Sequence, residues 1–250
     1  MDFKVRGHSK YKLKLENNLV EKYHHTNDDR LVKSAYKQKG FKSKFFKTPN
    51  VLNIERDGFK MEYISGYSFS QFLTAASKRD LDGFINKIDG YLKENQITNY
   101  DIPIELFINK IKSIDYDSTL LLSKIKNKKT VNVGVGICHG DLTLSNMIFA
   151  EDIYLIDFLD SYLESPTMDI VKLRQDTHLH WSLNMVENVT DLTKIKLGLR
   201  YIDEFLINNY EVEDYYFLQI INLIRIFPYT NDKKTEDWLN KNIKELCEHL

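Results

Sequence analysis

The stretch Ile137-Cys138-His139-Gly140-Asp141-Leu142-Thr143-Leu144-Ser145-Asn146-Met147-Ile148-Phe149 decides the fold, together with the later segment Tyr154-Leu155-Ile156-Asp157-Phe158-Leu159-Asp160. Asp141 is followed after four residues by Asn146, and eleven positions later Asp157 ends an apolar strand pattern. His139-Gly140-Asp141 alone is compatible with a plain turn between strands, because Gly and Asp both favour turns. Its combination with Asn146 and Asp157 at these offsets favours a loop that carries chemistry.

The polar residues of this pattern match the small set of groups that phosphoryl transfer requires. A carboxylate must orient the attacking hydroxyl and accept its proton, and Mg²⁺ must bridge the phosphates on hard oxygen ligands. We expect Asp141 to be this carboxylate, and Asn146 and Asp157 to be the metal ligands. His139 is expected to support the loop. The sequence thus predicts Mg²⁺-dependent transfer from ATP or GTP, between which the pattern does not choose.

The residues before Gly66 have the patterns of a small sheet with one helix. Alternating apolar and polar residues predict strands at 11–16, 19–23, 51–54 and 59–64. Asn17-Asn18 and Asp57-Gly58 predict tight turns, since Asn and Gly tolerate positive φ. Thr26-Asn27-Asp28-Asp29 predicts the start of a helix and Gly40 its end.

The chain after Gly66 is dominated by helical patterns. Apolar residues recur at spacings of three and four, which predicts helices at 68–77, 80–95, 102–126, 167–183, 192–209, 214–227 and 235–250. Short strands and tight loops are expected at 133–139 and 146–157. We therefore predict an α+β, bilobal fold, with a small β-rich N-lobe at 1–64 and a larger, mostly helical C-lobe at 65–250. A cleft between unequal lobes is a usual place for a ligand.

The overall composition argues against several other classes of protein. Lys and Arg number 35 against 36 Asp and Glu, so the formal charge of −1 offers no field for nucleic acid or an anionic membrane. The most apolar run, 218–227, is interrupted by Gln219, Asn222 and Arg225 and is too short to span a bilayer. Residues 1–6 lack the apolar region of a signal peptide. We expect a cytoplasmic protein that neither binds nucleic acid nor inserts into membranes.

His139-Gly140-Asp141-Leu142-Thr143-Leu144-Ser145-Asn146 with Leu155-Ile156-Asp157-Phe158 resembles the aminoglycoside phosphotransferase and choline kinase-like superfamily, whose members share the protein-kinase-like fold. The resemblance implies a small-molecule kinase, because Gly after the His is typical of these enzymes whereas protein kinases usually carry Arg there. Ser165-Pro166-Thr167-Met168-Asp169 resembles the segment after the metal Asp, which implies that Asp169 supports the catalytic loop. Met61-Glu62-Tyr63-Ile64-Ser65-Gly66 resembles the interlobe hinge, which implies that Glu62, Tyr63 and Ile64 bind the purine through their backbone.

The small lobe departs from the pattern of this superfamily. The Lys that grips the nucleotide phosphates is matched best by Lys22, with Lys12 and Lys14 as alternatives, and no Gly-rich phosphate loop precedes it. Its usual partner is a Glu in the following helix, where this chain offers only Asp28 and Asp29 at the helix start. The metal strand ends Asp-Phe-Leu rather than Asp-Phe-Gly, and no activation-loop segment follows. These features argue against a protein kinase.

The acceptor is expected beside Asp141, against the helical lobe. Candidate walls are Asp160, Tyr162, Glu164, Asp176, His178, His180 and Trp181. Acidic walls suit an amine-bearing acceptor and Trp181 suits a sugar or a choline-like cation, whereas core packing is an equally good interpretation of Trp181. His178 and His180 would not face the same way on a helix, so they predict no metal site. A looser resemblance to phosphotransferase-like proteins of bacterial capsule and surface-polysaccharide synthesis favours a sugar or polyol.

Three functions remain open on these grounds. A kinase for a small hydroxylated molecule, such as a sugar, polyol or amino alcohol, is favoured because the full set of Asp141, Asn146 and Asp157 serves catalysis. A non-catalytic, pseudokinase-like nucleotide-binding module is the alternative, supported by the missing Gly-rich loop and helix Glu. A protein kinase has less support than either.

Overall fold

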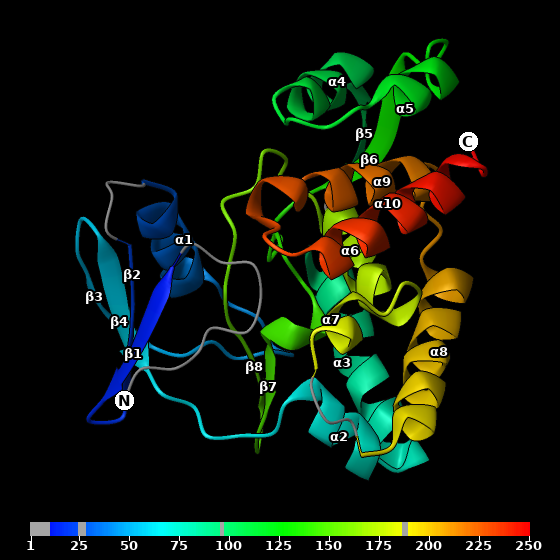
Figure 1. Ribbon diagram of the computed structural model, residues 1–250. Coiled ribbons are helices and arrows are strands. Elements are labelled where there is room, and N and C mark those ends of the chain that lie inside the picture. The colour runs from blue at the N-terminus through cyan, green and yellow to red at the C-terminus, as the bar shows by residue number, and fades with distance from the viewer. Residues whose placement is uncertain (1–10, 25–28, 96–97, 187–189) are drawn as a thin grey trace.

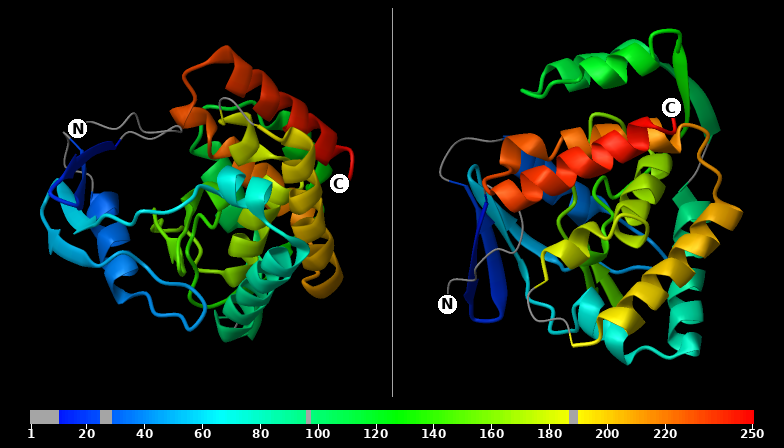
Figure 2. Two further views of the ribbon diagram at one scale, coloured as in Figure 1. Left: turned by 90° about the horizontal axis from the view of Figure 1, so that it is seen from below. Right: turned by 45° about the vertical axis from the view of Figure 1, so that its right-hand side comes forward.

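The computed structural model describes residues 11–24, 29–95, 98–186 and 190–250. Residues 1–6 and the predicted helix start at 26–28 lie outside this part of the chain. The described residues form a small sheet with one helix and, beside it, a larger assembly of helices (Figures 1 and 2). This arrangement confirms the predicted α+β, bilobal fold class. The lobe boundary predicted between residues 64 and 65 stays a prediction.

The sheet is antiparallel, and its strands follow the order β1-β2-β4-β3. They are β1 (Lys12–Glu16), β2 (Leu19–Tyr23), β3 (Val51–Ile54) and β4 (Gly58–Glu62). Asn17 and Asn18 have φ of 50° and 61°, so the β1–β2 turn uses the left-handed conformation that the Asn pair predicted. Helix α1 (Asp29–Gly40) buries Leu31 and Ala35 against this sheet, which gives the small lobe a core of its own.

The larger part consists of helices around a short hairpin. Its helices are α2 (Phe69–Ala75), α3 (Lys78–Asn95), α4 (Ile104–Lys112), α5 (Thr119–Lys124), α6 (Pro166–Thr177), α7 (Trp181–Asn184), α8 (Leu192–Asn209), α9 (Tyr215–Ile224) and α10 (Lys233–Cys247). Its strands are β5 (Thr98–Pro103), β6 (Thr130–Val135), β7 (Met147–Phe149) and β8 (Ile153–Leu155), and 3₁₀ turns lie at Leu144–Asn146 and Phe227–Tyr229. Helix α9 packs on both α6 and α10, and α8 runs along α3 (Figure 1). Within the described ranges, every helix is too short or too polar to cross a membrane.

Helix α6 lies between two hydrophobic cores. Its residues Ile170 and Leu173 belong to a cluster built with α2, α3, α8 and the β7–β8 hairpin. Its residues Met168 and Val171 belong to a second cluster built with β6, α4, α9 and α10. Apolar side chains therefore cover α6 on opposite sides, and nearly the whole helix is buried. Any charged side chain on α6 needs a partner inside the protein, because burial of an unpaired charge is costly.

Two predicted helices are wrong in their extent. Instead of one helix over 102–126, the chain forms strand β5, then helices α4 and α5, and then strand β6, which pairs with β5. The alternating residues of β5 pair with a strand some thirty positions away, and the register joins Ile102 to Val131. The helix predicted over 167–183 breaks between α6 and α7, where His180 adopts a left-handed φ of 61°. Both errors arise from tertiary contacts that override a local helix pattern.

Two connecting segments fix the small lobe to the β7–β8 hairpin. Downstream of α1, Lys47 N donates to Ile153 O at 3.0 Å and Leu155 N donates to Lys47 O at 2.8 Å. Downstream of β4, Tyr67 and Phe149 exchange backbone hydrogen bonds of 2.8 and 3.0 Å. Both chain segments that leave the small lobe are thus hydrogen-bonded to the β7–β8 hairpin. These bonds place the end of the hairpin between the two lobes.

Candidate active site

Both carboxylate oxygens of Asp141 have donors inside the protein. Lys172 Nζ lies 3.0 Å from Oδ1, and Asn146 Nδ2 donates to Oδ2 at 3.0 Å and to the Asp141 carbonyl oxygen at 2.8 Å. Both N–H groups of the Asn146 amide are thereby used, which leaves its Oδ1 as the atom that can bind a cation. Burial raises the pKa of Asp141, but Lys172, His139 and Asn146 together outweigh it and lower that pKa below its usual range. Asp141 is therefore ionised at neutral pH.

His139 holds the loop from within the protein. Its Nδ1 accepts from Asp141 N at 3.2 Å, so Nε2 carries the proton and donates to Ile156 O at 2.8 Å. Burial lowers the pKa of His139 to about 4, which keeps the ring neutral at pH 7. A neutral ring with both nitrogens engaged links the catalytic loop to the strand that ends before Asp157.

Asp169 of α6 binds the backbone that precedes Asp141. Its Oδ2 accepts from His139 N and from Tyr91 Oη, both at 2.7 Å, and its Oδ1 accepts from Gly140 N at 2.9 Å. Asp169 is fully buried, and burial raises its pKa to about 6 against the lowering effect of these donors. The three hydrogen bonds leave the loop backbone one conformation at this point.

Gly140 has a backbone conformation that residues with a side chain rarely adopt. Its φ is +89°, and a Cβ added to it would lie 2.5 Å from Leu159 O. Gly140→Ala is therefore expected to lower the free energy of unfolding by about 2–3 kcal/mol, measured by urea denaturation. The control is Gly83→Ala in α3, where a Cβ meets nothing within 4 Å and a stabilisation of about 0.5–1 kcal/mol is expected. Equal effects of the two substitutions would contradict this account.

Lys22 and Asp157 form an ion pair between the lobes, with Nζ 2.9 Å from Oδ1. Lys22 is only 8% exposed, which is unusual for Lys without a specific partner. Asp157 has a left-handed φ of 61°, a conformation that costs energy and gathers at functional sites. The hairpin register pairs Met147 with Leu155, so Asn146 and Asp157 lie at the same end of it. The structure thus brings together the residues predicted to bind phosphate and metal.

The alternatives to this pair are not formed. Lys14 pairs with Glu16 on its own strand at 2.7 Å, and Lys12 is exposed. In the described residues Lys22 binds Asp157 rather than Asp29, and Asp28 lies outside them. Lys22 therefore has a partner other than Asp29, because the carboxylate that ends the strand pattern reaches the lysine directly.

Helix α1 contacts the catalytic loop through Lys37, which the sequence analysis missed. Lys37 Nζ lies 2.7 Å from each carboxylate oxygen of Glu164 and donates to Leu159 O at 3.0 Å. It also lies 3.7 Å from the Sγ of Cys138, the residue before His139. This helix thus presents a cation to the residues that flank the 139–146 loop. The signal in the sequence is weak, because Lys37 is one of several lysines on and after α1.

The predicted hinge residues lie at and just after the end of β4. Glu62 N donates to Asn50 O and Tyr63 N donates to Asn18 O, both at 3.0 Å, so these two amides are used within the small lobe. The Ile64 N–H has no hydrogen-bond partner among the described residues. Of these three residues, Ile64 is therefore the one whose backbone donor stays available.

Two side chains predicted to line the acceptor are buried instead. Asp176 is 1% exposed, and its carboxylate accepts from Leu144 N and from Ser182 N. Trp181 is 8% exposed and packs on Trp238, with ring centroids 5.2 Å apart. Asp176 is thus not open as an acceptor wall and Trp181 follows the core-packing interpretation, because a helical pattern does not tell whether another element covers the face that carries them.

Three of the remaining candidate walls, Asp160, Glu164 and His178, have polar partners of their own, whereas the buried Tyr162 hydroxyl has no hydrogen-bond partner in the described part of the chain. Asp160 Oδ2 lies 3.7 Å from Lys33 Nζ and stays partly exposed. Glu164 binds Lys37, as described above, and His178 Nδ1 lies 2.9 Å from a tyrosine hydroxyl of α9. The structure therefore does not gather these acids into one unpaired anionic wall beside Asp141.

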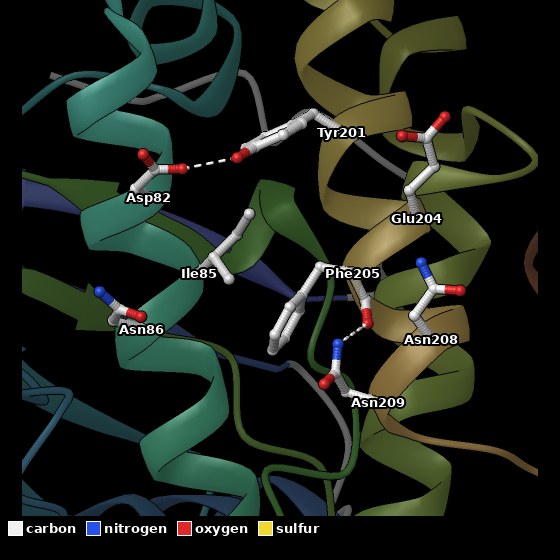
Figure 3. A pocket seen from close by; sticks show the side chains of 8 residues that line it. All are labelled: Asp82, Ile85, Asn86, Tyr201, Glu204, Phe205, Asn208 and Asn209. Carbon is white, nitrogen blue, oxygen red and sulfur yellow. Dashed lines mark hydrogen bonds between the residues drawn. The ribbon is translucent and has the colours of Figure 1, made fainter.

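A groove of about 440 Å³ lies between α3 and α8 (Figure 3). It is lined by Asp82, Ile85, Asn86, Tyr201, Glu204, Phe205, Asn208 and Asn209. Tyr201 Oη donates to Asp82 at 2.6 Å, and Asn209 Nδ2 donates to Phe205 O at 2.8 Å. None of the predicted site residues lines this groove, so it contributes nothing to the chemistry of the loop.

The fold matches solved structures of aminoglycoside phosphotransferases. A thermostable mutant of APH(4)-Ia, in a ternary complex with ADP and hygromycin B, superposes with a TM-score of 0.63 at 12% identity, over 99% of this chain and 92% of that one. The streptomycin–ATP complex of APH(2'')-IIa gives a TM-score of 0.53 at 16% identity, over 88% and 83% of the two chains. At these identities the likeness shows a shared fold.

The sequence itself has no significant match among curated proteins. It does match the description of one protein family over residues 42–173, more than half of the chain. That range contains the predicted hinge, the 139–146 loop and the β7–β8 hairpin. It also contains Asp157, which follows the hairpin, and Asp169 of α6. The predicted likeness to small-molecule kinases is thereby confirmed. The chain belongs to the ecdysteroid kinase-like family, and it shares the fold of aminoglycoside phosphotransferases.

Proposed function

We propose that this protein transfers the γ-phosphoryl group of ATP or GTP to a hydroxyl group of a small molecule. The observation that carries the proposal is the arrangement of Asp141, Asn146, Asp157 and Lys22 at the junction of the lobes. A buried lysine and a left-handed aspartate both cost stability. Their presence around one loop supports a role in chemistry.

In the proposed reaction, Asp141 takes the proton of the acceptor hydroxyl while the hydroxyl oxygen attacks the γ-phosphorus. The bond from that phosphorus to the bridging oxygen breaks, and its electron pair leaves with ADP or GDP. The lowered pKa of Asp141, with Lys172 as the largest opposing influence to burial, keeps the carboxylate ionised and able to receive the proton. The side chain is 33% exposed, so one side of it is open to an acceptor.

Asn146 and Asp157 fit a Mg²⁺ ion. The free amide oxygen of Asn146 and the Asp157 carboxylate are hard donors at one end of the hairpin. Across the described ranges, His, Cys, Asp and Glu side chains form no group of three or more that could hold a metal. Phosphate and water oxygens would complete the coordination, as Mg²⁺ readily permits. When bound, the ion would neutralise charge on the β- and γ-phosphates.

The nucleotide itself is expected to contact Lys22 and the hinge. Lys22 Nζ, now on Asp157, lies where it can turn to the phosphates once a cation takes over the carboxylate. The free Ile64 N–H would donate to the purine. Solved structures of this fold hold ADP in one case and ATP in another, which supports a nucleotide at this position.

For the acceptor, we propose a sugar, polyol or amino alcohol. Glu164 and Asp176 are already bound within the protein, which leaves little free negative charge for an amine and favours the sugar or polyol. The branch associated with surface-polysaccharide synthesis stays a prediction.

A non-catalytic nucleotide-binding module is the second candidate. It is favoured because Lys22 pairs with Asp157 and with no acid described on α1, whose Lys37 pairs with Glu164 instead. Such a module would bind nucleotide but would have no use for Asp141 as a base. Turnover therefore separates the two functions, whereas nucleotide binding is common to both.

Asp157→Ala is expected to remove the Mg²⁺ dependence of nucleotide binding, because it deletes the only carboxylate proposed to hold the metal. Calorimetric titration with ATP and GTP, with and without Mg²⁺, measures this dependence. The unsubstituted protein is expected to bind at least about tenfold more tightly with Mg²⁺. The variant is expected to bind equally in both conditions.

The matched control is Asp152→Ala, which removes a carboxylate of the same hairpin that pairs with Lys47 at the surface. It is expected to keep the Mg²⁺ dependence. Unchanged dependence in Asp157→Ala would contradict the metal role. If the unsubstituted protein binds neither nucleotide, the proposed function is wrong.

A further inference from the structure

Helix α6 holds the catalytic loop at three successive points along one face. Asp169 binds the backbone N–H groups of residues 139 and 140, Lys172 binds the side chain of Asp141, and Asp176 binds the backbone N–H of Leu144. The three residues are spaced by three and four positions, the spacing of neighbours on one helical face. The two acids hold backbone, whereas Lys172 alone reaches the side chain that is proposed to do the chemistry.

Lys172 differs from an ordinary structural cation on the same helix. Arg174, two residues on, pairs with Asp203 at 3.1 Å, and the two side chains are equally buried at 12% exposure. The Lys172 side chain is 9% exposed, but its partner Asp141 is 33% exposed. The ammonium group thus lies behind a carboxylate whose other side is open, which is where a support for a reacting group belongs.

The donors on Asp141 fix the plane of its carboxylate. Lys172 binds Oδ1 and Asn146 binds Oδ2, so each oxygen keeps lone-pair capacity for one further contact. The Asn146 donor comes from the loop itself, five residues away, and moves with it. Lys172 comes from α6, which is packed between the two cores, and therefore fixes the Asp141 carboxylate relative to the buried part of the lobe.

We infer that Lys172 is a positioning residue for phosphoryl transfer, which holds the Asp141 carboxylate in the orientation that receives the acceptor proton. This inference rests on the proposed function. In the step itself the new bond joins the acceptor oxygen to the γ-phosphorus, the bond to the bridging oxygen breaks, and the proton passes to Asp141. Lys172 keeps its own proton throughout, since it acts only through its hydrogen bond to Oδ1.

Nucleotide hydrolysis tests the inference without knowledge of the acceptor, because water then takes the acceptor's place. Lys172→Met is expected to lower the kcat of Mg²⁺-dependent hydrolysis by about 100-fold, as misplacement of a reacting group by about 1 Å does. Nucleotide affinity, measured by calorimetry, is expected to change by less than about threefold, because Lys172 binds Asp141 and not the nucleotide. Lys172→Arg is expected to recover most of the rate, since Arg restores a cationic donor.

A second cycle separates positioning from general support of the fold. In an Asp141→Asn background, Lys172→Met is expected to reduce the residual rate by less than about threefold, because residues that act as a unit are not additive. Lys172→Gln, which keeps a neutral donor of similar length, replaces the Met variant if thermal melts show that the latter does not fold. Arg174→Met, the control on the same helix, is expected to leave kcat within about threefold in either background.

The outcomes are distinguishable. Loss of rate in Lys172→Met that disappears in the Asp141→Asn background supports the inference. A retained rate in Lys172→Met and Lys172→Gln, or an equal loss in both backgrounds, overturns it while the proposed function stands. An unsubstituted protein that binds nucleotide with Mg²⁺ but shows no hydrolysis and no transfer overturns the kinase function, and with it this inference.

Discussion

Asp141→Asn is expected to lower phosphoryl transfer by about 10³-fold while nucleotide affinity stays within about threefold. Asparagine keeps the shape of the side chain and an oxygen for Lys172, but its amide cannot accept a proton at neutral pH. The nucleotide is not expected to touch this residue, so its binding should persist. Single-turnover kinetics and calorimetry on the same samples measure the two quantities.

The control for this result is Asp203→Asn, since Asp203 is another carboxylate bound by a cation of α6. It is expected to lower thermal stability and to leave turnover of the folded enzyme unchanged. Full turnover in Asp141→Asn would remove Asp141 from the role of base. Loss of nucleotide binding together with turnover would show instead that Asp141 holds the site together.

Asp169→Ala is expected to lower the free energy of unfolding by about 3–5 kcal/mol, one of the largest effects of a single substitution in this chain. It leaves the Gly140 N–H and the Tyr91 hydroxyl proton buried without an acceptor, and it leaves the His139 N–H only its 3.1 Å contact with Tyr91 Oη. Relief of the desolvation that raises the pKa of Asp169 to about 6 offsets only part of this loss. Urea denaturation followed by tryptophan fluorescence gives the value.

Asp82→Ala provides the comparison, because Asp82 also accepts from a tyrosine hydroxyl but lies at the surface. Its expected cost is below about 1 kcal/mol, since water replaces the lost hydrogen bond. A loss in Asp169→Ala no larger than in Asp82→Ala would mean that the catalytic loop keeps its shape without the buried carboxylate.

Several features of the fold and of the candidate site were predictable because their signals in the sequence are local. The turn at Asn17-Asn18 follows from residues that tolerate positive φ, and the short hairpin between Asn146 and Asp157 brings its ends together over few residues. The sheet and helix patterns gave the correct fold class for the same reason. The chemical roles of Asp141, Asn146 and Asp157 stay predictions until turnover and metal binding are measured.

The partners that cross long stretches of sequence were not predictable. Lys37 and Glu164 are 127 residues apart, and nothing near either one indicates the other. The acceptor and core-packing interpretations of Trp181 could not be separated, because a pattern reveals an aromatic face but not the helix α10 that covers it. Tertiary packing decides such questions, and local propensity does not contain it.

One missed signal was nonetheless present in the sequence. Asp169, Lys172 and Asp176 fall on one face of a helix whose other residues are mostly apolar. Charged residues at this spacing within an apolar helix indicate a buried face with fixed partners, because unpaired charges are not tolerated there. Applied to α6, that argument would have moved Asp176 from the acceptor to the loop and singled out Lys172.

The two lysines that link the lobes have a consequence for the catalytic cycle. A nucleotide that draws Lys22 away from Asp157 leaves the link between Lys37 and Glu164 intact, since that pair involves neither Lys22 nor Asp157. Nucleotide binding therefore replaces the Lys22–Asp157 ion pair by contacts through phosphate and metal, so the number of ionic links between the lobes stays the same. Glu164 is 46% exposed, so dissolved ions screen this pair. Product release is then the step whose rate should rise with ionic strength.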